Sequence, residues 1–153
     1  MDRNLDHGAR AKALFQQGYN CAQAVLLAFE DVTGLPVETA AKLASGFGGG
    51  IGRLREVCGT VSGAVMVLSL AHGYDDPADA EAKAAHYRTV QAFAARFKAE
   101  NGSIICRELL QGVPTTPGTV PEARTPEFYR KRPCAELVEL AARMTEEMLS
   151  EQA

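Results

Sequence analysis

The segment from Val57 to His72 constrains the fold of this chain more than any other feature of the sequence. It contains no aspartate, glutamate, lysine or arginine over sixteen residues. A helix that is apolar on every side is stable only when other parts of the protein surround it, so we expect a buried central helix here. Gly59 and Gly63 lie four residues apart on one face of that helix, where missing side chains would let a neighbouring helix come close.

Other segments show helical signals, and none shows the strict alternation of a half-buried strand. Asn20 and Ser103 are typical N-caps, and Asp76-Pro77 joins an N-cap to a proline at the first helical position. These signals predict an all-α fold: a single-domain helical bundle of about six to seven helices around the buried central helix. It covers residues 1–153, with a proline-rich loop at 113–124. The expected helices are 9–17, 21–32, 36–44, 57–72, 76–101, 104–110 and 133–150.

Length and charge exclude several classes of protein. A chain of 153 residues fits one domain, and a net charge of −3 is unlike the basic balance of general nucleic-acid or anionic-membrane binders. The first residues are polar and resemble no secretory signal, and the apolar stretch 57–71 is too short to span a bilayer easily. We therefore expect a cytoplasmic protein with no nucleic-acid or membrane partner.

Four cysteines carry most of the chemical information. Structural disulfides are disfavoured in a reducing cytoplasm, so an even number of cysteines indicates metal binding or redox chemistry first. No two of them form a C-x-x-C pair, which leaves zinc ribbons and thioredoxin-type motifs without support. Each falls within the first turn of an expected helix. They are Cys21, Cys58, Cys106 and Cys134.

A helix N-terminus favours thiolate over thiol, because its N–H groups and partial positive charge stabilise the anion. Arg53, Arg55, Arg107 and the basic run 130–132 lie near three of the cysteines and would lower their pKa values if they point inward. If the four helix ends converge, the cysteines form one site. They would then be ligands of an iron–sulfur cluster or of zinc, or reactive thiols. The simple alternative is that each is a small buried hydrophobic residue.

A glycine-rich stretch at 46–52 precedes the central helix. Its backbone N–H groups could cradle an anion beside Arg53 and Arg55. It has no G-x-G-x-x-G pattern, no preceding strand and no Walker ending, so we interpret it chiefly as a tight connector that needs positive φ angles. The candidate cofactor-binding residues are Gly48, Gly49, Gly50 and Gly59.

The histidines are poor candidates for metal ligands. None follows a glutamate by three residues, as the ligands of di-iron bundles do. His72 at a helix C-terminus is explained by the helix dipole. We expect none of His7, His72 and His86 to bind a metal.

Several stretches resemble the C-GCAxxG-C-C family of redox-active proteins. The resemblance covers residues 9–145 and includes all four family cysteines, and Thr60 stands where the family often has alanine. It implies a small prokaryotic protein whose cysteines bind a prosthetic group such as an iron–sulfur cluster, or are redox-active themselves. The matching stretches are Gly18-Tyr19-Asn20-Cys21, Gly46-Phe47-Gly48-Gly49-Gly50-Ile51-Gly52, Val57-Cys58-Gly59-Thr60-Val61-Ser62-Gly63, Cys106-Arg107-Glu108-Leu109-Leu110 and Cys134.

The leading hypothesis is an electron-transfer protein, with or without oxidoreductase activity, whose four cysteines hold an iron–sulfur cluster and serve a redox partner protein. A second hypothesis is a metal-free thiol–disulfide protein, for which four cysteines permit three pairings. A third is a zinc-stabilised or metal-free helical interaction module. The apolar content would also allow a homodimer.

Overall fold

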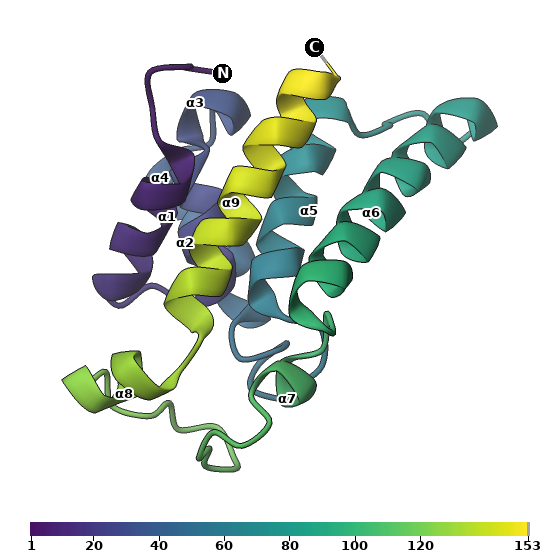
Figure 1. Ribbon diagram of the computed structural model, residues 1–153. Helices are drawn as coiled ribbons and strands as arrows, with labels where there is room; N and C mark the ends of the chain where they lie inside the picture. The colour runs from purple at the N-terminus through teal and green to yellow at the C-terminus, as the bar shows by residue number, and fades with distance from the viewer. Residues whose placement is uncertain (153) are drawn as a thin grey trace.

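The computed structural model describes residues 1–152, and its regular secondary structure there is helical apart from one isolated antiparallel bridge (Figure 1). The prediction of an all-α fold is confirmed. The helices are α1 His7–Gln16, α2 Cys21–Ala28, α3 Glu30–Thr33, α4 Val37–Ala44, the 3₁₀ helix η1 Ser45–Phe47, α5 Gly59–His72, α6 Ala80–Asn101, α7 Cys106–Leu109, α8 Pro126–Lys131 and α9 Cys134–Glu151.

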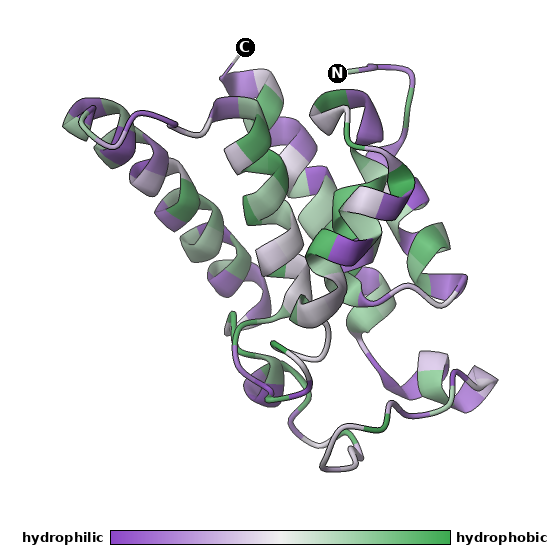
Figure 2. Cartoon of the chain, turned by 180° about the vertical axis from the view of Figure 1, so that it is seen from behind, coloured by the Kyte–Doolittle hydropathy of each residue, from purple (hydrophilic) through white to green (hydrophobic). Residues whose placement is uncertain are grey.

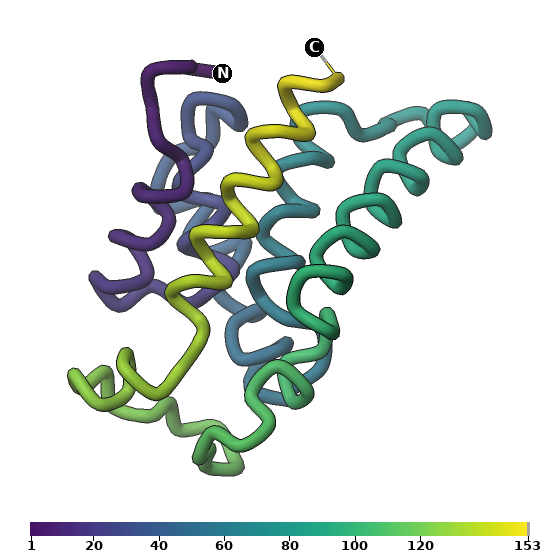
Figure 3. The backbone as a smooth tube through the Cα atoms, in the orientation of Figure 1, coloured from purple at the N-terminus to yellow at the C-terminus, as the bar shows by residue number. Residues whose placement is uncertain are grey.

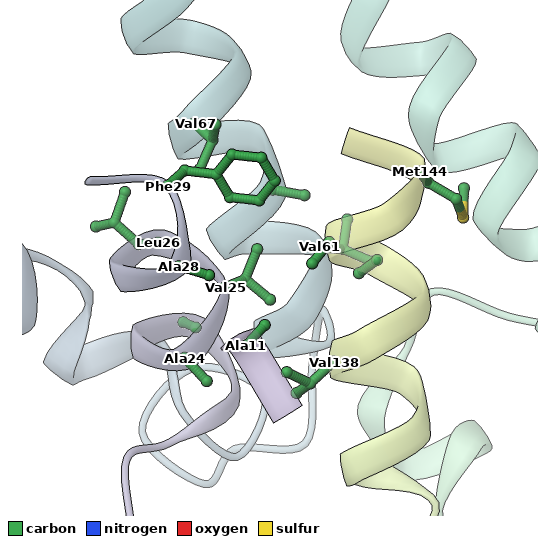
Figure 4. Packing of buried hydrophobic residues seen from close by; sticks show 14 of the residues in the cluster. Ala11, Ala24, Val25, Leu26, Ala28, Phe29, Val61, Val67, Val138 and Met144 are labelled. Carbon is green, nitrogen blue, oxygen red and sulfur yellow. The ribbon is translucent and has the colours of Figure 1, made fainter. Parts of the chain in front are cut away.

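The core lies between α1, α2, α5 and α9. Val25 of α2, Val61 of α5 and Val138 of α9 surround its centre and are at most 4% exposed (Figure 4). Burying a side chain of this size contributes about 1.5–3 kcal/mol. The uncharged helix α5 is the central one, as predicted, although its last turn emerges from the core, where Leu70 is 48% exposed.

α6 is the longest helix, and it buries few side chains for its length. It leans away from the bundle at its N-terminal end (Figures 1 and 3), and hydrophilic residues cover much of its outer surface (Figure 2). The side chains that it buries are His86, Phe93 and Phe97, and the two phenylalanine rings stack with centroids 6.3 Å apart. The C-terminal half of α6 therefore anchors the helix to the bundle.

His7, at the start of α1, is fully buried and ties the two ends of the chain together. Its ring stacks on Phe29 with centroids 4.3 Å apart. Its Nε2 lies 3.0 Å from Asp31 Oδ1, and its Nδ1 lies 2.9 Å from Glu146 Oε1 in α9. Both ring nitrogens thus have the partners that a buried polar group requires. Both chain ends lie at the pole of the molecule opposite to α7 and α8 (Figure 3).

Two helix boundaries differ from the sequence prediction. The helix expected over 21–32 is broken at Phe29, whose φ of −109° and ψ of 32° leave the helical region while its ring is fully buried against His7. The longest helix begins at Ala80 and not near Asp76, because Asp79 supplies the N-cap and accepts a hydrogen bond from the Ala82 N–H.

Two short helices, η1 and α8, were not predicted. Residues 113–124 form the expected loop, but α8 follows directly after it. Thr125 caps α8 by accepting a hydrogen bond from the Phe128 N–H, and Pro126 occupies its first position. None of the helices within residues 1–152 combines the length and the apolarity that crossing a membrane requires.

The predicted close approach at Gly59 and Gly63 is confirmed, and the neighbour is α2. A Cβ added at Gly59 would lie 3.1 Å from the Ala22 nitrogen and from the Cys21 Cβ. A Cβ at Gly63 would lie only 2.7 Å from the Ala22 carbonyl oxygen. Because that obstacle is backbone, a side chain at Gly63 would force the two helices apart.

We expect Gly63→Ala to destabilise the protein by about 1–3 kcal/mol, the usual cost of overpacking a tight core contact. The measurement is the free energy of unfolding in urea. Gly46→Ala is the matched control, because a Cβ there meets no atom within 4 Å and the φ of Gly46 is not left-handed. Equal stability of the two variants would show that the helices tolerate a wider spacing.

Candidate functional site

The N-terminal ends of α2, α5, α7 and α9 meet at one pole of the bundle (Figure 1), and each carries a cysteine. Cys21, Cys106 and Cys134 are the first residues of α2, α7 and α9, and Cys58 is the N-cap of α5. All four line one cavity of about 270 Å³. The structure therefore brings together the residues that the sequence singled out.

A short backbone pairing holds Cys58 beside Cys106. The Cys58 N–H donates to the Ile104 carbonyl at 2.8 Å, and the Cys106 N–H donates to the Glu56 carbonyl at 2.6 Å. These bonds flank the isolated antiparallel bridge, so two segments far apart in the sequence are held in register.

Of the two expected N-caps near the cysteines, one is right and one is wrong. Asn20 caps α2 in a full capping box, with Asn20 Oδ1 and Gln23 Oε1 each accepting from the other residue's N–H. Ser103 does not cap α7. The N-cap is Ile105, and the Ser103 hydroxyl oxygen instead accepts from the Ile105 N–H in a local turn.

The glycine-rich stretch forms a left-handed coil that ends beside the cysteines. Residues 49–53 all have φ between 53° and 71°, and Arg55 has a φ of 61°. The expected positive φ angles are thus confirmed at Gly49, Gly50 and Gly52 but not at Gly46 and Gly48, and Ile51, Arg53 and Arg55 adopt them too. Left-handed backbone costs a residue with a side chain roughly 1–2 kcal/mol, so the coil is strained where it delivers both arginines to the cavity.

The four candidate glycines line the same cavity. A Cβ at Gly50 would lie 2.6 Å from the Cys106 Cβ, so this position has no room for a side chain. Glycine is therefore required at this position because the backbone passes so close to Cys106. Cofactor binding by the glycines stays a prediction. The four candidate glycines that line the cavity are Gly48, Gly49, Gly50 and Gly59.

Cys21 and Cys134 form a pair of interacting thiols, and both are half-buried. The neighbouring Cys21 thiol lowers the pKa of Cys134 to about 7 in spite of burial. The charges of Arg132 and Arg124 lower this pKa further. The influence of Cys134, together with burial, raises the pKa of Cys21 well above its ordinary value. Cys134 therefore carries the negative charge of the pair.

Cys58 and Cys106 are more deeply buried and stay protonated. Burial raises the pKa of Cys58 to about 11, although the Thr60 hydroxyl lies 3.1 Å from its sulfur. Burial also raises the pKa of Cys106, although Arg55 Nη1 lies 3.8 Å away. The expectation that each helix start favours a thiolate is thus wrong for three of the four cysteines, because desolvation or the neighbouring thiol outweighs the helix end.

We expect Cys134 to be alkylated first, with a rate that rises with pH, reaches half its maximum near pH 7 and levels off above it as the thiolate becomes fully formed. Peptide mass spectrometry after brief iodoacetamide treatment at pH 5 to 9 measures this. Cys58 is the internal control, since its pKa of about 11 keeps it unreactive over this range. Faster labelling of Cys58 than of Cys134 would contradict the assignment.

Residues 113–124, which we call the strap, close one side of the cavity. Arg53 Nη1 donates to the Gly118 carbonyl at 2.9 Å and also to that of Val120, and Arg53 Nη2 donates to the Thr116 carbonyl at 2.9 Å. At the far end of the strap, Arg124 donates to two carbonyls at the end of α1 and in the turn that follows it. The strap thus depends on side-chain bonds at both ends.

Glu122 is the functional residue that the sequence analysis missed. A single oxygen, Glu122 Oε1, lies 2.9 Å from Arg132 Nη2, 3.1 Å from Arg53 Nη2 and 3.6 Å from Arg55 Nη2. Burial raises the pKa of Glu122, but a hydrogen bond from the Thr116 N–H and the charges of Arg132 and Arg53 outweigh it and bring the pKa to about 2. The available signal was that Glu122 is the sole carboxylate in the strap.

Glu122 should make stability depend on pH in the acid range. Because its pKa is lower in the folded protein, its contribution is complete above the ordinary value of 4.5 and is lost as the pH falls towards 2. We expect the wild type to lose more unfolding free energy between pH 6 and pH 3 than Glu122→Gln does. Glu127→Gln removes an exposed carboxylate whose pKa is lowered only by the solvent-exposed Lys131, so it should change this loss less than Glu122→Gln does. Urea titrations at both pH values test this.

The geometry does not provide a ready metal site. Among residues 1–152, no three histidine, cysteine, aspartate or glutamate side chains are arranged so that they could hold a metal ion. The four cysteines share the cavity walls, but their sulfur atoms do not form a ligand set as they stand. No disulfide joins any of them.

The fold and the cavity define a class of protein: an all-helical domain with four free cysteines at converging helix starts. Residues 19–148 match the family described as "Putative redox-active protein (C_GCAxxG_C_C)". The match covers most of the chain and all four cysteines, so the chain belongs to this family of redox-active proteins. No curated protein and no solved structure matches the chain significantly.

Proposed function

We propose that this chain is a thiol–disulfide redox protein whose reactive pair is Cys21 and Cys134. The observation that carries the proposal is that these two half-buried thiols line the same cavity. The pKa of Cys134 is also lowered to about 7, with Cys21 as the largest cause. They are also the half-buried pair, whereas Cys58 and Cys106 are only 6% and 8% exposed. A substrate in the cavity therefore has better access to this pair than to the other two sulfurs.

Cys134 is the attacking residue, because its pKa of about 7 supplies a thiolate at neutral pH. The thiolate attacks one sulfur of a substrate disulfide, which forms a mixed disulfide and releases one substrate thiolate. Cys21 then loses its proton and attacks the Cys134 sulfur, which forms the Cys21–Cys134 disulfide and releases the second substrate thiolate. The protein gives up two electrons and the Cys21 proton, and the substrate disulfide leaves as one thiolate and one thiol.

Arg132 has the position to assist both steps. Its charge lowers the pKa of Cys134, and its guanidinium also contacts Glu122 on the strap. Because Arg132 is only 7% exposed, water screens this charge little. A reducing compartment such as the cytoplasm would return the pair to the dithiol state, which agrees with the expected location.

The test uses protein purified anaerobically with a chelator and then treated with 2-hydroxyethyl disulfide. We expect the loss of two free thiols and a disulfide-linked peptide pair that contains Cys21 and Cys134. Cys21→Ser should trap the mixed disulfide on Cys134, and Cys134→Ser should abolish the reaction. Cys58→Ala is the control that keeps it. A linkage between Cys58 and Cys106, or four unreacted thiols, would refute the proposed pair.

A second candidate is the iron–sulfur cluster or zinc ion expected from the sequence. It is favoured by the position of all four cysteines around one cavity, and it would require their sulfurs to move closer together. Iron, zinc and labile-sulfide analysis of anaerobically purified protein decides between the candidates. Iron with matching sulfide would favour electron transfer through a cluster, zinc alone a structural site, and neither metal the thiol pair. The redox partner protein and the homodimer stay predictions.

A further inference from the structure

The cavity around the reactive pair is cationic, although the chain as a whole has a net charge of −3. Its lining includes a single carboxylate, that of Glu122, and the thiolate of Cys134 adds one more negative charge. Four guanidinium groups face these two charges, so the described lining residues leave an excess of positive charge. The four are Arg53, Arg55, Arg124 and Arg132.

Three of these arginines are engaged by the protein itself. Arg53 donates to the carbonyls of the strap, as described above. Arg124 donates to the Phe15 carbonyl at 2.9 Å and to the Tyr19 carbonyl at 3.0 Å. Arg132 pairs with Glu122 and stabilises the thiolate. Their positions are explained by the fold and by the proposed chemistry.

Arg55 differs from the other three. Its Nη2 is buried and has no hydrogen-bond acceptor among residues 1–152. The Glu122 Oε1 atom lies 3.6 Å from this nitrogen, beyond hydrogen-bond distance, and already accepts from the Thr116 N–H. On its other side, Arg55 Nη1 faces Cys106, a thiol that stays protonated and so cannot balance the guanidinium charge. A buried donor without an acceptor is costly to a folded protein.

The backbone at Arg55 carries a cost as well. Its φ of 61° is left-handed, and so are those of Arg53 and Ile51 before it. A strained backbone that holds an unpaired donor in a cavity is expected where that donor serves a ligand. The feature that completes the site is an anionic group beside Arg55 Nη2.

We propose that the cavity binds a small disulfide that carries a carboxylate, and that Arg55 Nη2 donates to this carboxylate while the disulfide lies against Cys134. A guanidinium is well suited to a carboxylate, because its planar N–H groups match the two oxygens. A volume of about 270 Å³ beneath the strap suits a small molecule. The inference rests on the proposed function: the protein dithiol becomes a disulfide, and the ligand disulfide becomes two carboxylate-bearing thiols.

The first experiment compares three disulfides of different charge: 3,3′-dithiodipropionate, 2-hydroxyethyl disulfide and cystamine. The rate of oxidation of the pair by each is divided by its rate with a free model thiol, which removes differences in intrinsic reactivity. We expect the anionic disulfide to react on the order of tenfold faster than the neutral one, with the cationic one slowest. Arg55→Gln should bring the ratio of the anionic to the neutral rate close to one.

Arg107→Gln is the matched control. Arg107 lies close by in α7, but it is 57% exposed, pairs with Glu56 and does not line the cavity. Its variant should keep the charge preference. In Arg55→Gln, the glutamine has to adopt the same left-handed φ as the arginine that it replaces, so the backbone strain is similar. Arg132 and Arg124 still lower the pKa of Cys134 in this variant. A change in the rate ratio alone would therefore report ligand binding.

The second experiment separates binding from redox chemistry. Suberate has the chain length of 3,3′-dithiodipropionate without its sulfurs, so it should raise the thermal midpoint of the wild type and of Arg107→Gln but not of Arg55→Gln. Equal normalised rates for all three disulfides and no effect of suberate would overturn the anion site and leave the thiol pair standing. Suberate binding without oxidation by any disulfide would keep the anion site, while the thiol–disulfide function and the disulfide nature of the ligand would fall.

Discussion

The contact between α2 and α5 at Gly59 and Gly63 is the constraint on which the site depends. Two glycines one helical turn apart let the backbone of α5 approach the first turn of α2 so closely that even a methyl side chain at Gly63 would collide with it. That approach places the start of α5, with Cys58, against the start of α2, with Cys21. Because α9 packs on both helices, its first residue joins the same pole. The spacing between α2 and α5 thus decides whether the four sulfurs share a cavity.

The chemistry of the four thiols follows from their surroundings more than from their similar places at helix starts. Cys58 and Cys106 are enclosed by protein, and desolvation keeps them neutral. Cys134 has the neighbouring thiol of Cys21 and the cations of Arg132 and Arg124, so it ionises. The favourable field of a helix end is a small effect compared with the loss of water around a charge. Of the four cysteines, Cys134 alone is therefore favoured as a thiolate.

Much of the fold was predictable because the decisive signals are local. The uncharged run over α5, the capping residue Asn20 and the glycine pair on α5 each act within a few residues, and the structure confirms them. The break at Phe29 was not predictable, since it depends on the burial of its ring against His7. The four candidate cysteines were correctly placed at helix starts for the same local reason.

The remainder of the site depends on contacts between distant segments. Nothing near Glu122 in the sequence shows that one of its oxygens forms ion pairs with both Arg53 and Arg132. Likewise, the left-handed φ of Arg55 was not predictable from the sequence, because glycine is the residue that adopts this conformation readily. The proposed pairing of Cys21 with Cys134 was one of three possibilities from the sequence, and the observations that favour it come from tertiary packing.

The packing of α1 and α2 against α9 also sets an order of events during synthesis. Glu146, the partner of His7, and Cys134, the neighbour of Cys21, both lie in α9, which leaves the ribosome after α1 and α2. Until α9 emerges, the pKa of Cys21 is not shifted by Cys134, and α1 and α2 lack the helix that packs against them. The proposed pair is thus assembled by the same step that brings α9 into the core, so a chain that stops before α9 contains Cys21 without Cys134.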